Sequence, residues 1–280
     1  MLSLTKRFYA TVLTFSARLP LKIFLLVALA LLVSVWMFNT PAGILGKADA
    51  VGYAVCHRID ARSFHLGSRP VPLCARCTGQ YLGAMLGIAY LLSTGKRRTG
   101  RPPWWMVGLL VAFAGIFVVD GFNSYLHLLP GTERLHLYEP NNTLRLVTGT
   151  GLGLGISVGL LPAFHQTLWQ KIDPRPILKD FRSFGLLLTL AVGMDLLVLW
   201  GPPLILYPLA LVSAAGILVL LTMVYTMVWL LIFKRDNTYE RWSQLAFPFL
   251  AGFLVALTQI AVLDFIRYWL TGTWGGFHFG

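Results

Sequence analysis

The sequence predicts an all-α fold: a polytopic helical membrane protein with about seven transmembrane helices. Of its 280 residues, 56% are hydrophobic and only 12% are charged, so a water-exposed surface could not be covered. A helix needs about 20 apolar residues to cross the hydrocarbon core. Seven stretches meet this need, at residues 20–39, 78–94, 104–123, 143–164, 183–200, 207–233 and 244–270.

Details within these stretches support the assignment. Tryptophans fall near the ends of the stretches, as in the aromatic belts of membrane proteins. They are Trp36, Trp104, Trp105, Trp169, Trp200, Trp229, Trp242 and Trp269. The sixth stretch follows Gly201-Pro202-Pro203 and contains Pro208. Because proline removes a backbone donor, we expect the first residues here to form an interfacial turn instead of helix.

The distribution of basic residues orients the bundle. Most of the 23 Lys and Arg precede the first stretch or follow the second, fourth and sixth. Positive loops stay on the cytoplasmic side, so we expect a cytoplasmic N-terminus and a C-terminus outside. We therefore attribute the net charge of +12 to the basic residues that orient the helices in the membrane, and nucleic acid is not an expected partner. The expected location is the bacterial cytoplasmic (inner) membrane, crossed several times.

All three cysteines lie in the first outer loop, residues 51–77. Cys74 and Cys77 begin a helix, where backbone N–H groups, the helix dipole and Arg76 favour thiolate. With Cys56 and His57 they make a full tetrahedral set for zinc, and His65 is a substitute for His57. Two alternatives stay open: a disulfide or redox thiol pair, and inert buried cysteines.

The motifs around these cysteines resemble a family of predicted bacterial membrane proteins, known as domain of unknown function 2085. The residues that carry the resemblance are Cys56-His57-Arg58, Arg62-Ser63-Phe64, Pro72-Leu73-Cys74-Ala75-Arg76-Cys77-Thr78-Gly79, Asp120-Gly121 and Asn142-x-x-Arg145-x-x-Thr148-Gly149. The resemblance implies a polytopic membrane protein and supplies no activity.

This resemblance suggests three parts of the chain. Residues 1–49 form an N-terminal anchor helix, since the apolar run is too long for a cleaved signal peptide. Residues 50–165 form the core that resembles the family, with the Cys-rich outer loop and three helices. Residues 166–280 form a C-terminal extension of three helices.

Several charged residues lie toward the outer ends of the predicted helices. A charge at a helix centre costs roughly 2.5–3.5 kcal/mol on insertion scales, so each needs a reason. We interpret Asp120 and Asp195 as candidate catalytic carboxylates. Asp264 and Arg267, three residues apart, are expected to form a structural ion pair. Candidate ligand-binding residues are Arg58, Arg62, Arg76, Thr78, Asn142, Arg145 and Thr148.

Small-residue spacing predicts which helices meet. Gly79, Gly83 and Gly87 form one ladder, and a second consists of Gly151, Gly155 and Gly159. Facing ladders allow close backbone approach and would bring the helix starts at Cys74 and Asn142 together. Asn142 is also a suitable N-cap. The remaining histidines, His127, His136, His165 and His278, show no ligand spacing and are interpreted as loop or interface residues.

These observations favour a protein that binds or processes a phosphate-bearing lipid, or a lipid-linked anionic substrate, at the outer leaflet. Arginines and helix starts would hold the anion. One alternative is a membrane thiol–disulfide redox protein, and another is a transporter. The sequence does not decide whether the protein is an enzyme, and it contains no nucleotide-binding loop or zinc-protease motif.

Overall fold

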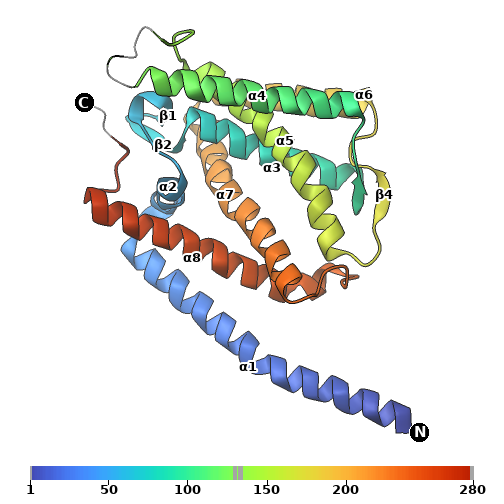
Figure 1. The fold of residues 1–280 in the computed structure, drawn as a ribbon. Helices are drawn as coiled ribbons and strands as arrows, with labels where there is room; N and C mark the ends of the chain where they lie inside the picture. Colours follow the sequence, from blue (N-terminus) through green and yellow to red (C-terminus); the bar gives the residue numbers. More distant parts are fainter. Residues whose placement is uncertain (1, 129–130, 132–134, 278–280) are drawn as a thin grey trace.

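A computed structural model describes residues 2–128, 131 and 135–277, with side chains described from residue 20 onward. The described chain is mostly helical, which confirms the all-α class (Figure 1). The helices are α1 (Leu2–Asn39), α2 (Gly43–Val55), α3 (Ala75–Thr94), α4 (Trp104–Leu126), α5 (Asn142–Leu168), α6 (Phe181–Trp200), α7 (Pro203–Ile232) and α8 (Ala246–Thr271). Short 3-10 turns are η1 (Asp60–Arg62) and η2 (Trp242–Leu245). The strands are β1 (Ser63–Leu66), β2 (Arg69–Cys74), β3 (Arg98–Gly100) and β4 (Asp173–Pro176).

Six of the described helices are long and apolar enough to cross a membrane. They are α4, α5, α6, α7, the part of α1 from Pro20, and α8 together with η2. Helix α3 has 20 residues, also enough to span, but is less apolar. It packs against both α5 and α7, so it needs less lipid-facing surface. The expectation of about seven membrane helices is therefore confirmed.

The Cys-rich segment is more ordered than a loop. Residues 51–55 complete α2, and β1 pairs with β2 in an antiparallel hairpin that leads directly into α3. A Cβ at Gly52 of α2 would overlap the carbonyl oxygen of Pro72 in β2, so this close approach requires glycine. The hairpin thus presses on α2 and fixes the start of α3.

The predicted turn before the sixth span is wrong. Helix α7 begins at Pro203 and continues through Pro208. Proline is favoured in the first turn because its missing N–H would lack a helical partner there anyway.

Helices α3 and α5 cross at very short distance, as their glycines predict. A Cβ at Gly79 would overlap the carbonyl oxygen of Leu146, and one at Gly149 would overlap that of Arg76. The second predicted ladder is nevertheless wrong, because Gly151 faces Phe113 of α4 and Gly159 has no atom within 4 Å. The α5 residues that face α3 are Gly149, Gly153 and Ser157. Each precedes a residue of the predicted ladder by two positions, which places it on the opposite side of the helix.

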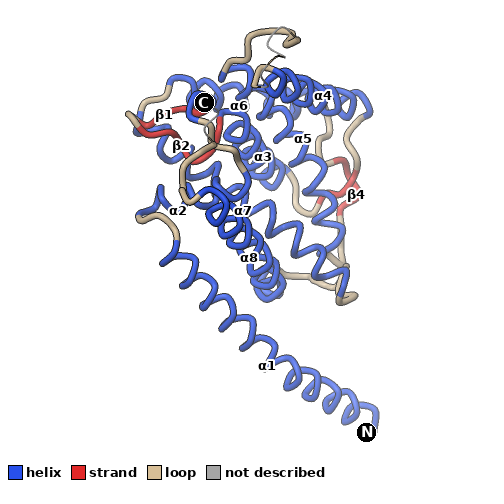
Figure 2. The backbone as a smooth tube through the Cα atoms, turned by 60° about the vertical axis from the view of Figure 1, so that its left-hand side comes forward, coloured by secondary structure: helices blue, strands red, loops and turns tan. Residues whose placement is uncertain are grey.

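The segments that follow α3, α5 and α7 carry many of the basic residues. They meet at the end of the bundle opposite the β1–β2 hairpin. Strand β3 after α3 pairs in parallel with β4 after α5, and Trp169 forms a bridge with Tyr239 after α7. Figure 2 shows β4 far from the β1–β2 hairpin, at the opposite end of the bundle. This arrangement fits alternating spans, and the assignment of the basic end to the cytoplasm remains a prediction.

Helix α1 is peripheral and packs along α8, while its N-terminal part runs away from the bundle (Figure 1). Trp36 Nε1 donates a hydrogen bond of 3.0 Å to Asp264 Oδ2 of α8. The expected Asp264–Arg267 ion pair is therefore wrong, since Asp264 takes its hydrogen bond from α1 and Arg267 turns to other acceptors. His278 lies outside the described residues.

Candidate metal centre and arginine cluster

Three thiols converge where α2, the hairpin and α3 meet. Cys56 ends α2, Cys74 is the residue before α3, and Cys77 lies in the first turn of α3. Their sulfur atoms all lie within 4.8 Å of one another, and all three are free thiols. Cys56 and Cys74 are buried, and Cys77 is partly buried. We call these three residues the Cys cluster; it could hold a metal ion.

Hydrogen bonding makes the thiols of the Cys cluster unequal. The Cys74 N–H donates to Cys56 Sγ at 3.3 Å. Hydrogen bonds from the thiols of Cys74 and Cys77 hold the pKa of Cys56 well below its usual value. The hydrogen bond to Cys56 and burial raise the pKa of Cys74 to about 12. The metal-free cluster therefore holds one thiolate between two protonated thiols. A metal ion can displace these protons and bind all three sulfurs as thiolates.

The Cys cluster is enclosed by apolar side chains and by one arginine from the far end of the chain. Leu73, Ile217 of α7 and Ile260 of α8 pack around it. Arg267 of α8 donates to three carbonyl oxygens, those of Tyr53 and Cys56 at 2.5 Å and that of His57 at 3.2 Å. These carbonyls end α2, where a cation is favourable.

The histidines predicted as the fourth ligand are not equally placed. His57 Nδ1 lies 4.0 Å from Cys56 Sγ, but the group with mutual distances within 4.8 Å contains the three sulfurs alone. His65 pairs with Asp60 at 3.1 Å, which leaves it outside the cluster. Among the described residues, the structure thus brings together three of the four predicted ligand atoms, and His57 lies beside them.

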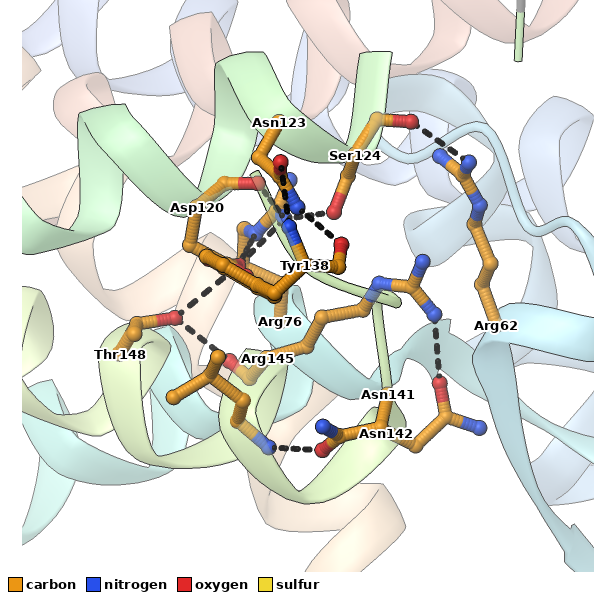
Figure 3. A network of polar contacts seen from close by, with 11 residues as sticks. Arg62, Arg76, Asp120, Asn123, Ser124, Tyr138, Asn141, Asn142, Arg145 and Thr148 are labelled. Atoms are coloured by element: carbon orange, nitrogen blue, oxygen red, sulfur yellow. Dashed lines mark hydrogen bonds and ion pairs between the residues drawn. The ribbon is translucent and has the colours of Figure 1, made fainter. Parts of the chain in front are cut away.

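A second polar group lies where α3, α4 and α5 meet (Figure 3). We call Arg62, Arg76 and Arg145, with Asp120, the arginine cluster. Arg76 of α3 reaches Asp120 Oδ2 of α4 through Nε at 3.1 Å and Nη2 at 2.5 Å. The same Nη2 donates to Ser124 Oγ at 2.8 Å.

Asp120 is fully engaged by its neighbours. Besides Arg76, Tyr138 donates its hydroxyl to Oδ1 at 2.9 Å, and Thr148 donates to Oδ2 at 3.3 Å. Its side chain is 1% exposed. A carboxylate with this many donors is held as an anion, so its role here is to position Arg76.

The arginine cluster carries more positive than negative charge. Arg62 and Arg145 are only 7% and 5% exposed. Arg62 donates to the carbonyl oxygen of Ser124 at 2.8 Å, and Arg145 donates to Asn142 Oδ1 at 2.9 Å, so both bind neutral oxygens. Burial first, and then the like charges of Arg145 and Arg76, lower the pKa of Arg62 to about 10. Arg145 Nε is buried without a partner among the described residues.

Other predicted ligand-binding residues have structural partners. Arg58 lies apart from the arginine cluster and pairs with Asp49 at 2.8 Å. Thr78 donates to the carbonyl oxygen of Leu73 and so fixes the end of β2. The N-cap of α5 is Asn141, not Asn142, because Asn141 Oδ1 accepts from the N–H of Leu144.

Asp195 does not join Asp120 in one site. It accepts a 2.7 Å hydrogen bond from Thr150 and lines an apolar groove between α4, α5 and α6. The groove has a volume of about 230 Å³. Thr148 lines this groove and also donates to Asp120, so the groove adjoins the arginine cluster.

The segment that closes the arginine cluster was not predicted. Asn123 of α4 accepts from the N–H of Leu137 at 2.5 Å and donates to the carbonyl oxygen of Tyr138 at 2.9 Å. These bonds place the Tyr138 hydroxyl on Asp120. A polar residue such as Asn123 in the last turn of an apolar helix was the only available signal.

The fold and these two clusters define a polytopic helical membrane protein with buried polar centres at one end of the bundle. The chain belongs to the family described as predicted membrane protein (DUF2085), which matches residues 56–159. That range holds the Cys cluster and the arginine cluster together.

Two archaeal relatives support this assignment. An uncharacterized protein of Methanothermobacter thermautotrophicus is 32% identical over 104 residues, which cover 37% of this chain and 82% of the relative. The uncharacterized protein MJ1492 of Methanocaldococcus jannaschii is 29% identical over 124 residues, or 44% of this chain and 71% of the relative. No solved structure matches the chain. Membership shows a multi-pass membrane protein; a bacterial membrane is not confirmed by these archaeal relatives.

Proposed function

We propose that this protein binds the phosphate group of a lipid or lipid-linked compound through Arg62, Arg76 and Arg145. The observation that carries the proposal is the charge imbalance: the buried Arg62 and Arg145 and the partly buried Arg76 accompany one carboxylate, and only Arg76 forms an ion pair with it among the described residues. Buried charges are normally paired because desolvation is costly. A phosphate would supply the missing negative charge, and its oxygens match the guanidinium fork.

Helix geometry adds to the attraction for an anion. Arg76 lies in the first turn of α3, and Arg145 in the first turn of α5. The positive ends of both helix dipoles therefore point toward the arginine cluster. Asp120 is already engaged by four hydrogen bonds, so the proposal is one of binding, with Asp120 as a positioning residue.

The groove between α4, α5 and α6 favours a lipid over a free anion. Apart from Thr148, Thr150 and Asp195, its lining is apolar. Its helices expose large apolar side chains such as Ile116, Val147 and Val192, which suits contact with acyl chains. A phosphate on the arginine cluster and a hydrocarbon chain in the groove would together occupy both sides of Thr148.

For the Cys cluster we propose a structural zinc ion. Three converging thiols are soft ligands that suit zinc, and a nearby imidazole commonly completes the set. A rotation of His57, whose Nδ1 lies 4.0 Å from Cys56 Sγ, would supply the fourth ligand. The ion would join the end of α2 to the start of α3. We also propose that this end of the bundle faces outward from a prokaryotic cytoplasmic membrane.

The binding proposal is tested by lipid binding to purified protein in nanodiscs. Phosphatidic acid, diacylglycerol and inorganic phosphate are compared as ligands for the wild type, Arg145→Lys and Arg175→Lys. Arg175 is the matched control because it is 73% exposed and pairs with Asp173. We expect phosphatidic acid to bind best and Arg145→Lys to weaken it about tenfold, since lysine keeps the charge but loses the fork.

Two results would contradict this proposal in different ways. Equal binding by Arg145→Lys and Arg175→Lys means that the arginine cluster is not the site. Equal binding of inorganic phosphate and phosphatidic acid keeps the anion site but removes the role of the groove.

A thiol–disulfide redox function is the second candidate, and the observation that favours it is the mutual proximity of the three sulfurs. Alkylation and intact-mass measurement on protein purified without oxygen distinguishes it, because a redox pair should appear as a stable disulfide after mild oxidation. A transporter predicts polar side chains along a whole path, whereas Arg76, Asp120 and Arg145 lie together at one end of α3, α4 and α5.

A further inference from the structure

The end of α4 and the segment before α5 bring two histidines and a glutamate together. Donor atoms of His127, His136 and Glu139 all lie within 4.8 Å of one another. His136 Nε2 is 3.1 Å from Glu139 Oε1, and the two imidazole rings meet edge to face with centroids 5.1 Å apart. The geometry points to a second metal site, in which these three residues bind one divalent ion of the zinc class.

The donor set suits such an ion. Two imidazoles and one carboxylate are the ligands of many catalytic zinc sites, with metal–ligand distances of about 2.0–2.2 Å. Ligand atoms around one tetrahedral ion at those distances lie roughly 3.5 Å apart. His136 Nε2 and Glu139 Oε1 are close to this spacing at 3.1 Å, and the donor atom of His127 lies within 4.8 Å of the donors of both residues.

The backbone that carries these ligands is held in place without a metal. Asn123 accepts from the N–H of Leu137 and donates to the carbonyl oxygen of Tyr138, the two residues between His136 and Glu139. Asn123 and His127 are four residues apart, so their side chains share one face of the helix end. The same contacts that close the arginine cluster therefore place His136 and Glu139 beside His127.

The environment of His136 is a second, independent observation. Its side chain is only 18% exposed, and its Nδ1 is buried without a hydrogen-bond partner among the described residues. A buried ring nitrogen without a partner is unfavourable, and histidine is the commonest protein ligand for such metals. A metal ion bound at Nδ1 would satisfy that nitrogen, so the ring has two candidate ligand atoms, Nδ1 and the Nε2 that faces Glu139.

A comparison within the chain shows what is special about the site. His65 and Asp60 form another histidine–carboxylate pair with the same 3.1 Å separation. The carboxylates of the two pairs are similarly exposed, Asp60 at 74% and Glu139 at 79%, but no third donor joins His65 and Asp60 among the described residues. A surface ion pair alone explains His65 and Asp60, whereas His127 makes the other group a site for a metal.

With three protein ligands, a fourth coordination position remains for water or another oxygen ligand. Tyr138 lies between the metal ligands in sequence and donates to Asp120, so the site adjoins the arginine cluster. If the proposed phosphate binding holds, the ion would offer one more positive charge to the same anion. The metal site itself does not depend on that proposal.

The experiment is metal analysis of full-length protein in nanodiscs, stripped with chelator, reloaded with Zn²⁺ and washed. Zinc is counted by mass spectrometry, and X-ray absorption separates sulfur ligands from nitrogen and oxygen ligands. We expect the wild type to bind a zinc ion with nitrogen and oxygen ligands. His136→Ala and His127→Ala should each lose this ion, while His65→Ala should keep it.

Unchanged zinc content and unchanged nitrogen–oxygen coordination in both His127→Ala and His136→Ala would overturn the inference. So would a wild type that takes up only sulfur-bound zinc. Loss of sulfur-bound zinc alone in these two variants, with the nitrogen–oxygen-bound ion kept, would overturn it as well. Thermal unfolding of the chelated variants should match the wild type, which shows that the substitutions act on the metal.

Discussion

The Cys cluster and the arginine cluster lie next to each other on the first turn of α3, yet their charges are balanced in opposite ways. In the Cys cluster, hydrogen bonds from Cys74 and Cys77 lower the pKa of Cys56, and Arg267 caps the helix end beside them. The arginine cluster keeps two guanidinium groups without a carboxylate partner among the described residues. Without ligands, the polar groups of one region bond to one another, whereas the other region keeps charges that the proposed anion would balance.

Substitution in the Cys cluster should have the largest effect. Cys74→Ser should lose the sulfur-bound metal and lower the free energy of unfolding by at least about 3 kcal/mol, because structural zinc sites contribute to folding directly. For a chain of this size that corresponds to a melting temperature lower by roughly 6–12 °C. Metal analysis and thermal unfolding in nanodiscs measure both effects, and chelation of the wild type is the control. Stoichiometric sulfur-bound metal in Cys74→Ser would contradict the proposed zinc site of the Cys cluster.

Acid should weaken metal binding in the Cys cluster. The pKa of Cys74 is raised to about 12 in the metal-free protein, so this thiol holds its proton at neutral pH and must release it to bind metal. Affinity should therefore fall at least tenfold for each unit that the pH is lowered, or about 100-fold from pH 7.5 to 5.5. Competition with a chelator of known proton affinity measures the slope. A flat profile would mean that Cys74 is not a ligand.

The helix crossing that supports both clusters can be tested with two glycines of α5. Gly149→Ala should destabilise the protein by about 1–3 kcal/mol, because its Cβ would overlap the carbonyl oxygen of Arg76. Gly159→Ala is the matched control: nothing lies within 4 Å, so alanine should be neutral or slightly stabilising. Chemical unfolding of the two variants decides, and equal stabilities would contradict the observed helix face.

The smallest expected effect is a change in the free energy of unfolding that is opposite in sign to that of Cys74→Ser. Arg145→Met removes one of several like charges and one hydrogen bond to Asn142, so it should raise the free energy of unfolding by about 1 kcal/mol without ligand. The same variant should lose the stabilisation that phosphatidic acid gives the wild type. Thermal unfolding with and without this lipid shows both. A destabilised Arg145→Met that still responds to the lipid would make the arginine cluster structural.

Helix positions and the closeness of α3 and α5 could be predicted because they depend on local composition and on small residues at a four-residue spacing. The face of α5 that contacts α3 could not be predicted, because two glycine ladders run along this helix and only packing selects one. Their residues are Gly149 and Gly153, and Gly151, Gly155 and Gly159. Helix α2 was missed because its 13 residues are too short to span.

The site was predictable in its residue types and less so in its pairings. Arg62, Arg76, Arg145 and Asp120 do come together, as do the three cysteines. A local rule failed for Arg267, because three carbonyl oxygens at the end of α2 compete with the carboxylate one turn away. Distant acceptors of this kind, and the segment around Tyr138, are not encoded in spacing along one helix.

The first turn of α3 has a consequence for how ligands influence each other. Cys77 and Arg76 are consecutive residues that point into different clusters, and this turn is locked against α5 by Gly149. An ion that orders the turn from one side lowers the entropy cost of ordering it from the other. If the proposed metal and anion both bind, occupancy at either cluster would change affinity at the other by the same factor.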